Sequence, residues 1–265
     1  GMAWWSWIKA SVRGLAPQDP QDPQAARPAR VVVQSDWRGA ELRFKSGTAQ
    51  SRMSRWAPDR LVVDYTRTML GSLLLTPDPR DVGMVGLGGG SQAKFLHRHL
   101  RGARVEVFEC DAEVLALRRR FRIPDDDARL VVRHADAARA LRARVGAYDL
   151  LLVDGYDVHG IPEGLSTQRF YADCRNALRA GGALAVNLYD TAHAAHVQRL
   201  RLAFGAANVW VVEEERQSNR VAFARVPPAP DAAPTPASPA LAPRGARELA
   251  DVFARLRDVF VAGPD

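Results

Sequence analysis

Between residues 81 and 225, short runs of hydrophobic residues alternate with longer mixed segments of helix length. The hydrophobic runs read VGMVGLG, RVEVFEC, RLVVRHAD, YDLLLVDG, ALAVNLYD, NVWVVEEE and NRVAFAR. Such runs are typical of strands buried on both faces, and their alternation with helices is typical of a parallel sheet. The pattern therefore predicts an α/β domain over residues 79–225, with a doubly wound, mostly parallel sheet of seven strands.

The last two hydrophobic runs, around residues 209–212 and 221–223, are separated by only a short polar stretch. A parallel pair of strands needs a long crossover connection, usually a helix, so these two runs must form an antiparallel hairpin. Dinucleotide-binding domains usually continue with parallel strands. A terminal antiparallel hairpin therefore favours the Rossmann-like fold of S-adenosylmethionine-dependent methyltransferases.

The remaining chain divides into three parts. Residues 1–30 are rich in Pro, Gln and Asp without a hydrophobic period, which predicts a flexible segment. Residues 31–78 carry the short β-prone runs VVVQSDW, ELRFKSG and RLVVDY, which predict a small β-rich subdomain. Residues 226–265 combine a Pro/Ala-rich linker with an expected amphipathic helix. Its hydrophobic positions are Leu249, Val252, Phe253, Leu256, Val259 and Phe260.

Composition narrows the classes of partner. The net charge is +7, but 34 of the 37 basic residues are arginines scattered along the chain, and no basic run is interleaved with aromatic residues. We therefore expect no nucleic-acid partner. The two cysteines exclude a disulfide framework and favour a cytoplasmic setting, and no Cys/His run has the spacing of a metal site. The hydrophobic stretch near the N-terminus is too short to span a membrane.

A cluster of glycines follows the first predicted strand of the large sheet. The segment Gly86-Leu87-Gly88-Gly89-Gly90-Ser91 lies between this strand and a helix predicted over about 91–100. Glycines permit a tight turn and let a ligand approach the backbone, while the helix N-terminus offers unpaired N–H groups. The next strand ends in Glu109, where an acidic side chain can accept hydrogen bonds from both hydroxyls of a ribose. Gly86, Gly88, Gly90, Ser91 and Glu109 are therefore candidate nucleoside-binding residues.

Acidic residues also follow the next two predicted strands. Asp136, with Ala137 after it, follows strand 129–133, and Asp154 ends strand 148–153. Ligands of open α/β sheets lie at the carboxyl ends of the strands, so these residues would face one crevice with Glu109. Asp136 alone is equally compatible with a helix cap. Cys110 is compatible with contact to an adenine ring, although we expect a small buried side chain.

The order of these motifs resembles the spermidine synthase family of aminopropyltransferases. The resemblance covers about residues 59–223 and rests on GLGGG, VFECD, RHADA, YDLLLVDGYD, EGLSTQRFY and ALRAGGALAVN. The fourth and fifth motifs are the most specific, because they resemble the family's Tyr-Asp-hydrophobic-Asp-x-x-Asp stretch and the loop that closes over the substrates. The β-rich segment 31–78 lies where this family has an N-terminal β domain.

The resemblance implies that an amine nitrogen attacks the methylene group beside the sulfonium of decarboxylated S-adenosylmethionine, the co-substrate, and releases methylthioadenosine. Asp154 would accept the proton from the amine, because a protonated amine is a poor nucleophile. Asp157 and Glu163 would hold the distal nitrogen of a diamine such as putrescine, and Tyr156 and Tyr65 would complete the amine site.

The resemblance also implies roles in nucleoside binding. Glu109 would hold the ribose, and Asp136 and Ala137 would lie at the adenine, with Asp136 binding its amino group. Gln50, in Thr-Ala-Gln-Ser, resembles the family's Gln near the sulfonium nucleoside. By analogy with the family we expect a homodimer that binds only small molecules.

Three positions depart from the family pattern. Ser91 replaces the glycine-loop Asp that grips the amino group of the aminopropyl donor. Tyr156 lies between the two carboxylates of Asp154-Gly155-Tyr156-Asp157, where the family has Ser-Ser. Arg67 replaces an acid in the family's Tyr-Gln-Glu-Met, and we expect its charge to weaken a pocket for dicationic amines. An S-adenosylmethionine-dependent methyltransferase and a noncatalytic nucleoside-binding relative therefore remain as alternatives.

Overall fold

The computed structural model describes residues 31–35, 39–44, 49–54, 64–87, 90–155, 163–188, 193–214 and 220–264. For the three described segments before residue 55, and for Glu163, it describes the backbone only. The main sheet has seven strands in the order β6-β5-β4-β7-β8-β10-β9. They are β4 (Asp81–Val85), β5 (Arg104–Glu109), β6 (Leu130–His134), β7 (Tyr148–Val153), β8 (Leu178–Asn187), β9 (Val209–Glu213) and β10 (Arg220–Arg225).

Strand pairing follows the pattern expected from the sequence. β4 pairs in parallel with β5 and β7, β5 with β6, and β7 with β8. β10 pairs antiparallel with both β8 and β9, so the predicted terminal hairpin is confirmed. The parallel strands are hydrophobic because helices cover both faces of the sheet. The prediction of a mostly parallel α/β sheet of seven strands is confirmed.

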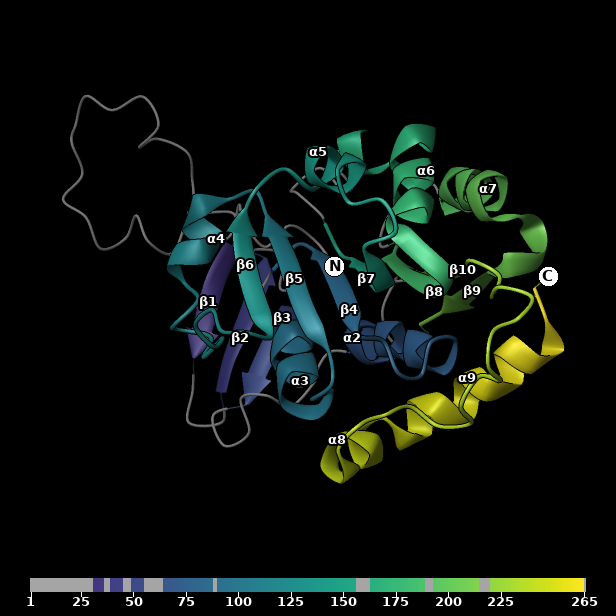
Figure 1. Ribbon diagram of the computed structural model, residues 1–265. Coiled ribbons are helices and arrows are strands. Elements are labelled where there is room, and N and C mark those ends of the chain that lie inside the picture. The colour runs from purple at the N-terminus through teal and green to yellow at the C-terminus, as the bar shows by residue number, and fades with distance from the viewer. Residues whose placement is uncertain are drawn as a thin grey trace.

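Helices form a layer on each face of this sheet (Figure 1). One layer contains α5 (Ala137–Arg142), α6 (Gln168–Ala177) and α7 (His193–Phe204). The other contains α2 (Asp64–Met69), the 3-10 helix η1 (Leu70–Leu74), α3 (Ser91–His99), α8 (Pro243–Glu248) and α9 (Ala250–Ala262). Each layer encloses its own cluster of buried hydrophobic side chains against the sheet. The short elements α4 (Ala112–Ala116), η2 (Glu163–Leu165) and η3 (Ala206–Asn208) lie in the connections.

A separate sheet of three antiparallel strands precedes this domain in the sequence; its first two strands lie in the predicted β-prone runs VVVQSDW and ELRFKSG, and its third strand lies in a segment for which no strand was predicted. It consists of β1 (Val31–Ser35), β2 (Gly39–Phe44) and β3 (Ala49–Ser54). The run RLVVDY behaves differently: its last two residues begin helix α2, and residues 60–63 lie outside the described residues. Helix α2 and η1 fall within 31–78 but contact β8 of the large sheet, and α2 also contacts β10. The N-terminal segment 1–30 lies outside the described residues as well.

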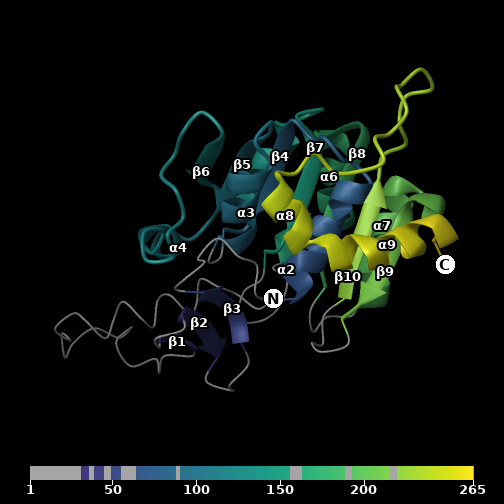
Figure 2. The ribbon, with the colours of Figure 1, turned by 90° about the horizontal axis from the view of Figure 1, so that it is seen from below.

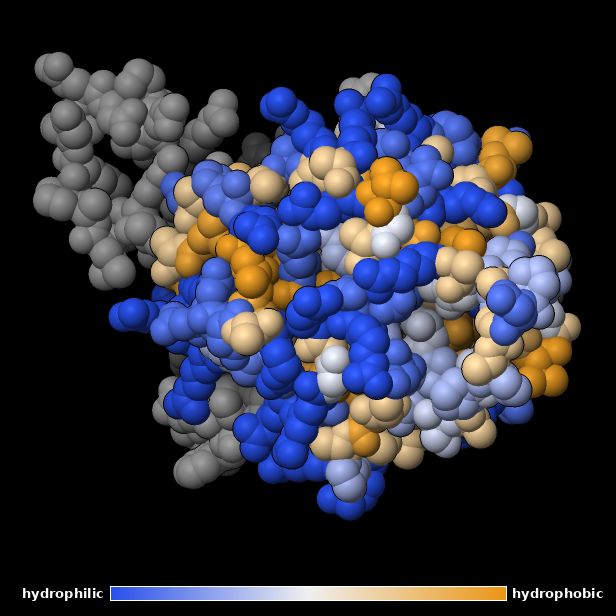
Figure 3. Space-filling view, in the orientation of Figure 1, coloured by the Kyte–Doolittle hydropathy of each residue, from blue (hydrophilic) through white to orange (hydrophobic). Residues whose placement is uncertain are grey.

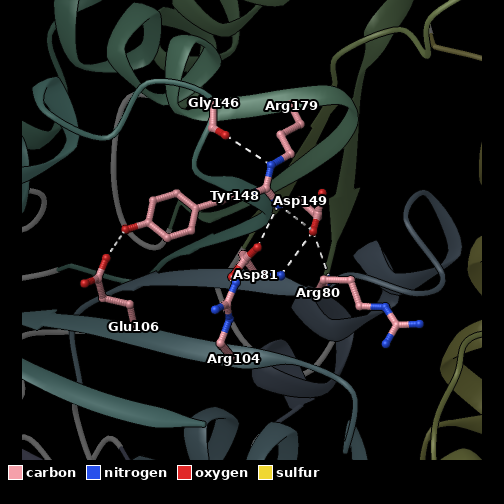
Figure 4. A network of polar contacts seen from close by, with 8 residues as sticks. All are labelled: Arg80, Asp81, Arg104, Glu106, Gly146, Tyr148, Asp149 and Arg179. Carbon is pink, nitrogen blue, oxygen red and sulfur yellow. Dashed lines mark hydrogen bonds and ion pairs between the residues drawn. The ribbon is translucent and has the colours of Figure 1, made fainter. Parts of the chain in front are cut away.

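Ion pairs join the amino ends of several strands (Figure 4). Asp81, the first residue of β4, accepts hydrogen bonds from Nε of Arg104 at 3.0 Å and from Nη1 of Arg179 at 2.8 Å. Asp149 of β7 accepts from the same Arg179 nitrogen at 3.1 Å and from the N–H of Asp81 at 3.1 Å. This charged cluster stabilises the amino edge of the sheet and lies at the opposite end of the strands from the expected crevice.

The face of the molecule seen in Figure 3 is covered mostly by polar residues, with hydrophobic residues in several small groups. None of the helices in the described ranges is long and apolar enough to span a membrane. The predicted amphipathic helix is present as α9, which follows the Pro/Ala-rich segment and the short helix α8.

Candidate active site

A glycine turn connects β4 to α3 at the carboxyl edge of the sheet. Gly86 has a φ of +90°, and a Cβ atom there would lie 2.8 Å from the backbone oxygen of Asp154. Gly90 precedes α3 with a φ of +71°, and a Cβ atom there would lie 2.4 Å from Ile123. Only glycine meets both requirements, because other residues rarely adopt this left-handed region. Gly88 lies outside the described residues.

The carboxylate of Asp154 lies directly after β7, beside this turn, and is 9% exposed. The hydroxyl of Tyr65 donates a hydrogen bond to its Oδ2 at 3.0 Å. The side-chain amide of Asn187 donates a hydrogen bond to its Oδ1 at 3.0 Å. Tyr65 belongs to α2 and Asn187 ends β8, so two elements orient the carboxylate from different sides.

This arrangement makes Asp154 a suitable proton acceptor. Two neutral donors fix the plane of the carboxylate, and each oxygen keeps a second lone pair for another partner. A carboxylate held in this way can accept a proton from a group that enters the crevice, provided that the group comes within hydrogen-bond reach. Of the carboxylates predicted for the amine site, Asp154 is the one whose side chain the structure describes.

Glu109 ends β5, on the other side of the glycine turn, and its side chain is fully buried. Its Oε2 accepts the N–H of Leu87 at 2.9 Å, and its Oε1 accepts the N–H of Asp111 at 2.9 Å. Burial raises the pKa of Glu109 to about 7, although these backbone hydrogen bonds act in the opposite direction. A ribose would therefore have to use the remaining lone pairs of a carboxylate that already fixes the glycine turn.

The other predicted nucleoside-binding residues surround the carboxyl ends of β5 and β6. Asp136 caps helix α5, because its Oδ1 accepts the N–H of Ala138 at 2.9 Å, and its side chain is exposed. Ala137 is buried at the first position of this helix. Cys110 is exposed, so the expectation of a buried side chain is wrong. Partial burial and the charge of Glu109 raise the pKa of the Cys110 thiol to about 11, which disfavours a nucleophilic role.

Ser91 and Arg67, two departures from the family pattern, lie in different parts of the fold. Ser91 is buried at the first position of α3, next to the glycine turn. Arg67 forms two hydrogen bonds with Asp251 of α9, at 2.6 and 3.1 Å. The charge of Arg67 is therefore paired with the C-terminal helix, and its effect on an amine pocket stays a prediction.

Besides Gly88, four predicted site residues have no described side chain. Tyr156 and Asp157 fall outside the described residues, and only the backbone of Gln50 and Glu163 is described. Gln50 lies in β3, and Glu163 begins η2. Within the described ranges, no three His, Cys, Asp or Glu side chains form a group that could hold a metal ion.

Asn187 is a site residue that was not predicted from the sequence. This residue is fully buried at the end of β8, the strand next to β7. A signal was available, because a polar residue ends the hydrophobic run ALAVN at the same edge of the sheet as the other strand-end residues. Its contact with Asp154 depends on the neighbouring position of β7 and β8.

No protein-family model matches the chain. Its curated relatives include the polyamine aminopropyltransferase of Chromobacterium violaceum, which is 34% identical over 166 residues. These residues are 62% of this chain and 64% of the relative, so the chain spans just under two thirds of the length of this relative. They also include the polyamine aminopropyltransferase of Neisseria meningitidis serogroup A, 32% identical over 187 residues, which are 67% of this chain and 71% of the relative.

Solved structures share the fold at lower sequence identity. A probable spermidine synthase from Corynebacterium glutamicum has a TM-score of 0.62 and 18% identity, covering 74% of this chain and 76% of that one. Human methyltransferase-like protein 13 in complex with SAH has a TM-score of 0.56 and 20% identity, covering 73% of this chain and 92% of that one. Both likenesses confirm the Rossmann-like methyltransferase fold expected from the hairpin.

Proposed function

Because this chain belongs to the polyamine aminopropyltransferase family, we propose that it transfers an aminopropyl group from decarboxylated S-adenosylmethionine to an amine. Transferases of this family transfer an alkyl group other than methyl. Putrescine or a related amine is the proposed acceptor, and methylthioadenosine is the nucleoside product.

The position of Asp154 carries this proposal. Its carboxylate lies at the carboxyl edge of the sheet, next to the glycine turn, and is oriented by Tyr65 and Asn187. In the proposed reaction this carboxylate takes a proton from the ammonium group of the acceptor. The freed nitrogen lone pair attacks the methylene carbon beside the sulfonium, so that a C–N bond forms and the C–S bond breaks. The sulfur keeps the bonding electrons and leaves as neutral methylthioadenosine.

Nucleoside binding is proposed for the residues on the β5 side of the crevice. Glu109 would accept hydrogen bonds from the ribose hydroxyls through its remaining lone pairs. Asp136 would bind the amino group of the adenine, which would lie beside Ala137 and Cys110. Gln50 would lie near the sulfonium. A positively charged ligand is compatible with this edge of the sheet, because acidic side chains lie at the ends of three of its parallel strands.

Acceptor binding is proposed for the carboxylates beyond Asp154. Asp157 and Glu163 would hold the distal nitrogen of a diamine, with Tyr156 and Tyr65 beside it. Since Arg67 is paired with Asp251, its charge does not argue against a dicationic acceptor. We also propose a homodimer, by analogy with the family, and a cytoplasmic setting, from the two cysteines of the sequence. Light scattering of the purified protein tests the oligomeric state.

A methyltransferase is the second candidate, and Ser91 is the observation that favours it. The family's Asp at this position binds the amino group of the aminopropyl donor, and a carboxylate there would repel the carboxylate of intact S-adenosylmethionine. Ser91 is neutral and removes this repulsion. The same fold occurs in human methyltransferase-like protein 13, whose structure was solved in complex with SAH.

The released nucleoside distinguishes the two candidates. Purified protein is mixed with decarboxylated S-adenosylmethionine plus putrescine, and separately with S-adenosylmethionine plus a cell extract, and the nucleosides are identified by mass spectrometry. Aminopropyl transfer predicts methylthioadenosine in the first mixture, dependent on added amine. Adenosylhomocysteine in the second mixture, with no methylthioadenosine in the first, would identify a methyltransferase instead.

A further inference from the structure

The C-terminal segment crosses the helical layer that contains α2, α3 and η1. The N–H of Ala240 donates to the backbone oxygen of Pro77 at 2.8 Å, and the N–H of Ala242 donates to that of His99 at 2.8 Å. Gly245 of α8 lies so close to His99 that an added Cβ atom would be 2.6 Å from its ring. These contacts fix the point from which α9 begins.

Helix α9 then packs on η1 and on the antiparallel end of the sheet (Figures 1 and 2). An added Cβ atom at Gly71 of η1 would lie 2.0 Å from Cδ1 of Leu256, so the two helices approach closely there. Near the other end of α9, the ring of Phe260 makes edge contacts with Trp210 of β9 and Phe223 of β10. The buried residues of this face are Val252, Phe253 and Leu256.

Polar contacts join α9 directly to α2. Arg67 donates to both carboxylate oxygens of Asp251 and to the backbone oxygen of Glu248, the last at 2.7 Å. Arg255 donates to Oγ1 of Thr68 at 2.7 Å. The pKa of Asp251 lies below its ordinary value because Arg67 binds its ionised form. A guanidinium that grips both oxygens fixes direction as well as distance.

The same short helix reaches the candidate active site on its other side. Tyr65 of α2 donates to Asp154, and the backbone oxygen of Thr66 accepts the amide of Gln92 at 3.2 Å. Helix α2 has six residues, too few to be stable by itself, so contacts with its neighbours determine its position. Arg67 and Thr68 therefore connect α9 to the helix that places the Tyr65 hydroxyl.

We propose that the Arg67–Asp251 ion pair makes α9 a positioning element of the reaction, because it holds α2 where the Tyr65 hydroxyl stays bonded to Asp154. Arg67 and Asp251 are positioning residues that act through Tyr65. The inference rests on the proposed function, since turnover is one of its readouts. It also assigns a role to the C-terminal helix beyond completion of the hydrophobic core.

The first test compares Asp251→Asn with a matched control in the full chain. The control is Glu213→Gln, which removes the charge from the ion pair between Glu213 and Arg220, a pair of similar exposure at the hairpin β9-β10. Asp251→Asn is expected to lower kcat roughly three- to tenfold and to leave the KM for the nucleoside within about twofold. Glu213→Gln is expected to leave both constants unchanged. Equal constants for Asp251→Asn and the parent protein would overturn the inference.

A double-mutant cycle separates positioning from general stability. In a Tyr65→Phe background the hydroxyl is already absent, so Asp251→Asn is expected to lower kcat no further. Losses that multiply in the double variant would show that Asp251 does not act through Tyr65. The double variant Arg67→Asp with Asp251→Arg restores an ion pair with exchanged charges, and it is expected to recover part of the kcat lost in Asp251→Asn. A kcat as low as that of Asp251→Asn would contradict the role of the ion pair.

Hydrogen exchange of the α2 amides provides a readout that does not depend on turnover. Faster exchange over residues 64–69 is expected in Asp251→Asn and not in Glu213→Gln. If the parent protein releases no methylthioadenosine but α2 exchanges faster in Asp251→Asn, the proposed function fails while the anchoring of α2 stands. If the parent protein is active and α2 exchange is the same in both variants, the anchoring role fails.

Discussion

The side-chain amide of Asn187 lies 3.0 Å from Oδ1 of Asp154, across two neighbouring parallel strands. The Tyr65 hydroxyl lies at the same distance from the other carboxylate oxygen. Neither donor carries a charge, so within the part of the chain that the structure describes no ion pair of Asp154 would compete for an incoming ammonium group. The geometry suits a carboxylate that must bind a cation and then accept its proton.

Removal of the Asn187 amide should slow the reaction without loss of the nucleoside site. In Asn187→Leu, Oδ1 of Asp154 loses a donor in a buried position. We expect kcat to fall about ten- to a hundredfold, since a hydrogen bond to a charged group contributes about 1.5–3 kcal/mol and about 1.4 kcal/mol is tenfold in rate. The affinity for methylthioadenosine, measured by calorimetry, should change less than about twofold. Asn208→Leu is the control, because Asn208 bonds the backbone of Phe204 at 2.9 Å, and kcat should stay unchanged.

Replacement of the proposed base should have a larger effect. An amide cannot accept the amine proton, so Asp154→Asn is expected to reduce kcat by about a hundredfold or more. The control is Asp149→Asn at the amino end of the same strand, which should lower the free energy of unfolding and leave kcat nearly unchanged. Turnover of Asp154→Asn close to that of the parent protein would exclude Asp154 as the base.

The sequence predicts the elements better than it predicts the contacts between them. Hydrophobic runs and the short polar stretch before residue 220 identify the seven strands and their terminal hairpin, because these signals are local. The bonds from Tyr65 to Asp154 and from Arg67 to Asp251 join residues 89 and 184 positions apart, so one sequence contains no signal that pairs them. The β-prone residues before Tyr65 also obscure α2, a short helix that depends on tertiary packing.

Nucleoside affinity should depend on pH through Glu109. Burial raises its pKa to about 7 from the ordinary value of 4.5, and the ionised carboxylate is the better acceptor for hydrogen bonds from two ribose hydroxyls. The affinity for methylthioadenosine is therefore expected to be several-fold tighter at about pH 8 than at about pH 6. Calorimetry at both values checks this. In Glu109→Gln the affinity should be weaker and should no longer depend on pH. A pH dependence that stays the same in this variant would show that another group causes it.

The raised pKa of Glu109 also makes the free energy of unfolding depend on pH. The folded chain holds the Glu109 proton more tightly than the unfolded chain, so the contribution of Glu109 to the free energy of unfolding falls as pH rises from 4.5 to about 7. It is constant above that range. Urea unfolding of the parent protein and of Glu109→Gln across these pH values measures the difference, which should have this sign.

Gly86 should tolerate no side chain. Gly86→Ala combines left-handed strain of about 1–2 kcal/mol with a clash against the Asp154 backbone, so both stability and kcat should fall. Gly146→Ala is the matched control, because Gly146 has a φ of +57° and no atom within 4 Å of an added Cβ atom. It should lose only the strain energy, as measured by urea unfolding, and keep its kcat. Equal losses of kcat in Gly86→Ala and Gly146→Ala would show that the contact of Gly86 with the Asp154 backbone is not needed for turnover.

The most direct measurement is the mass of the amine product. Purified protein, decarboxylated S-adenosylmethionine and putrescine should give putrescine with one added aminopropyl group, in an amount equal to the methylthioadenosine released. Asp154→Asn should form this amine at least about a hundredfold more slowly. Methylthioadenosine without the extended amine, or equal rates in the two proteins, would contradict aminopropyl transfer with Asp154 as the base.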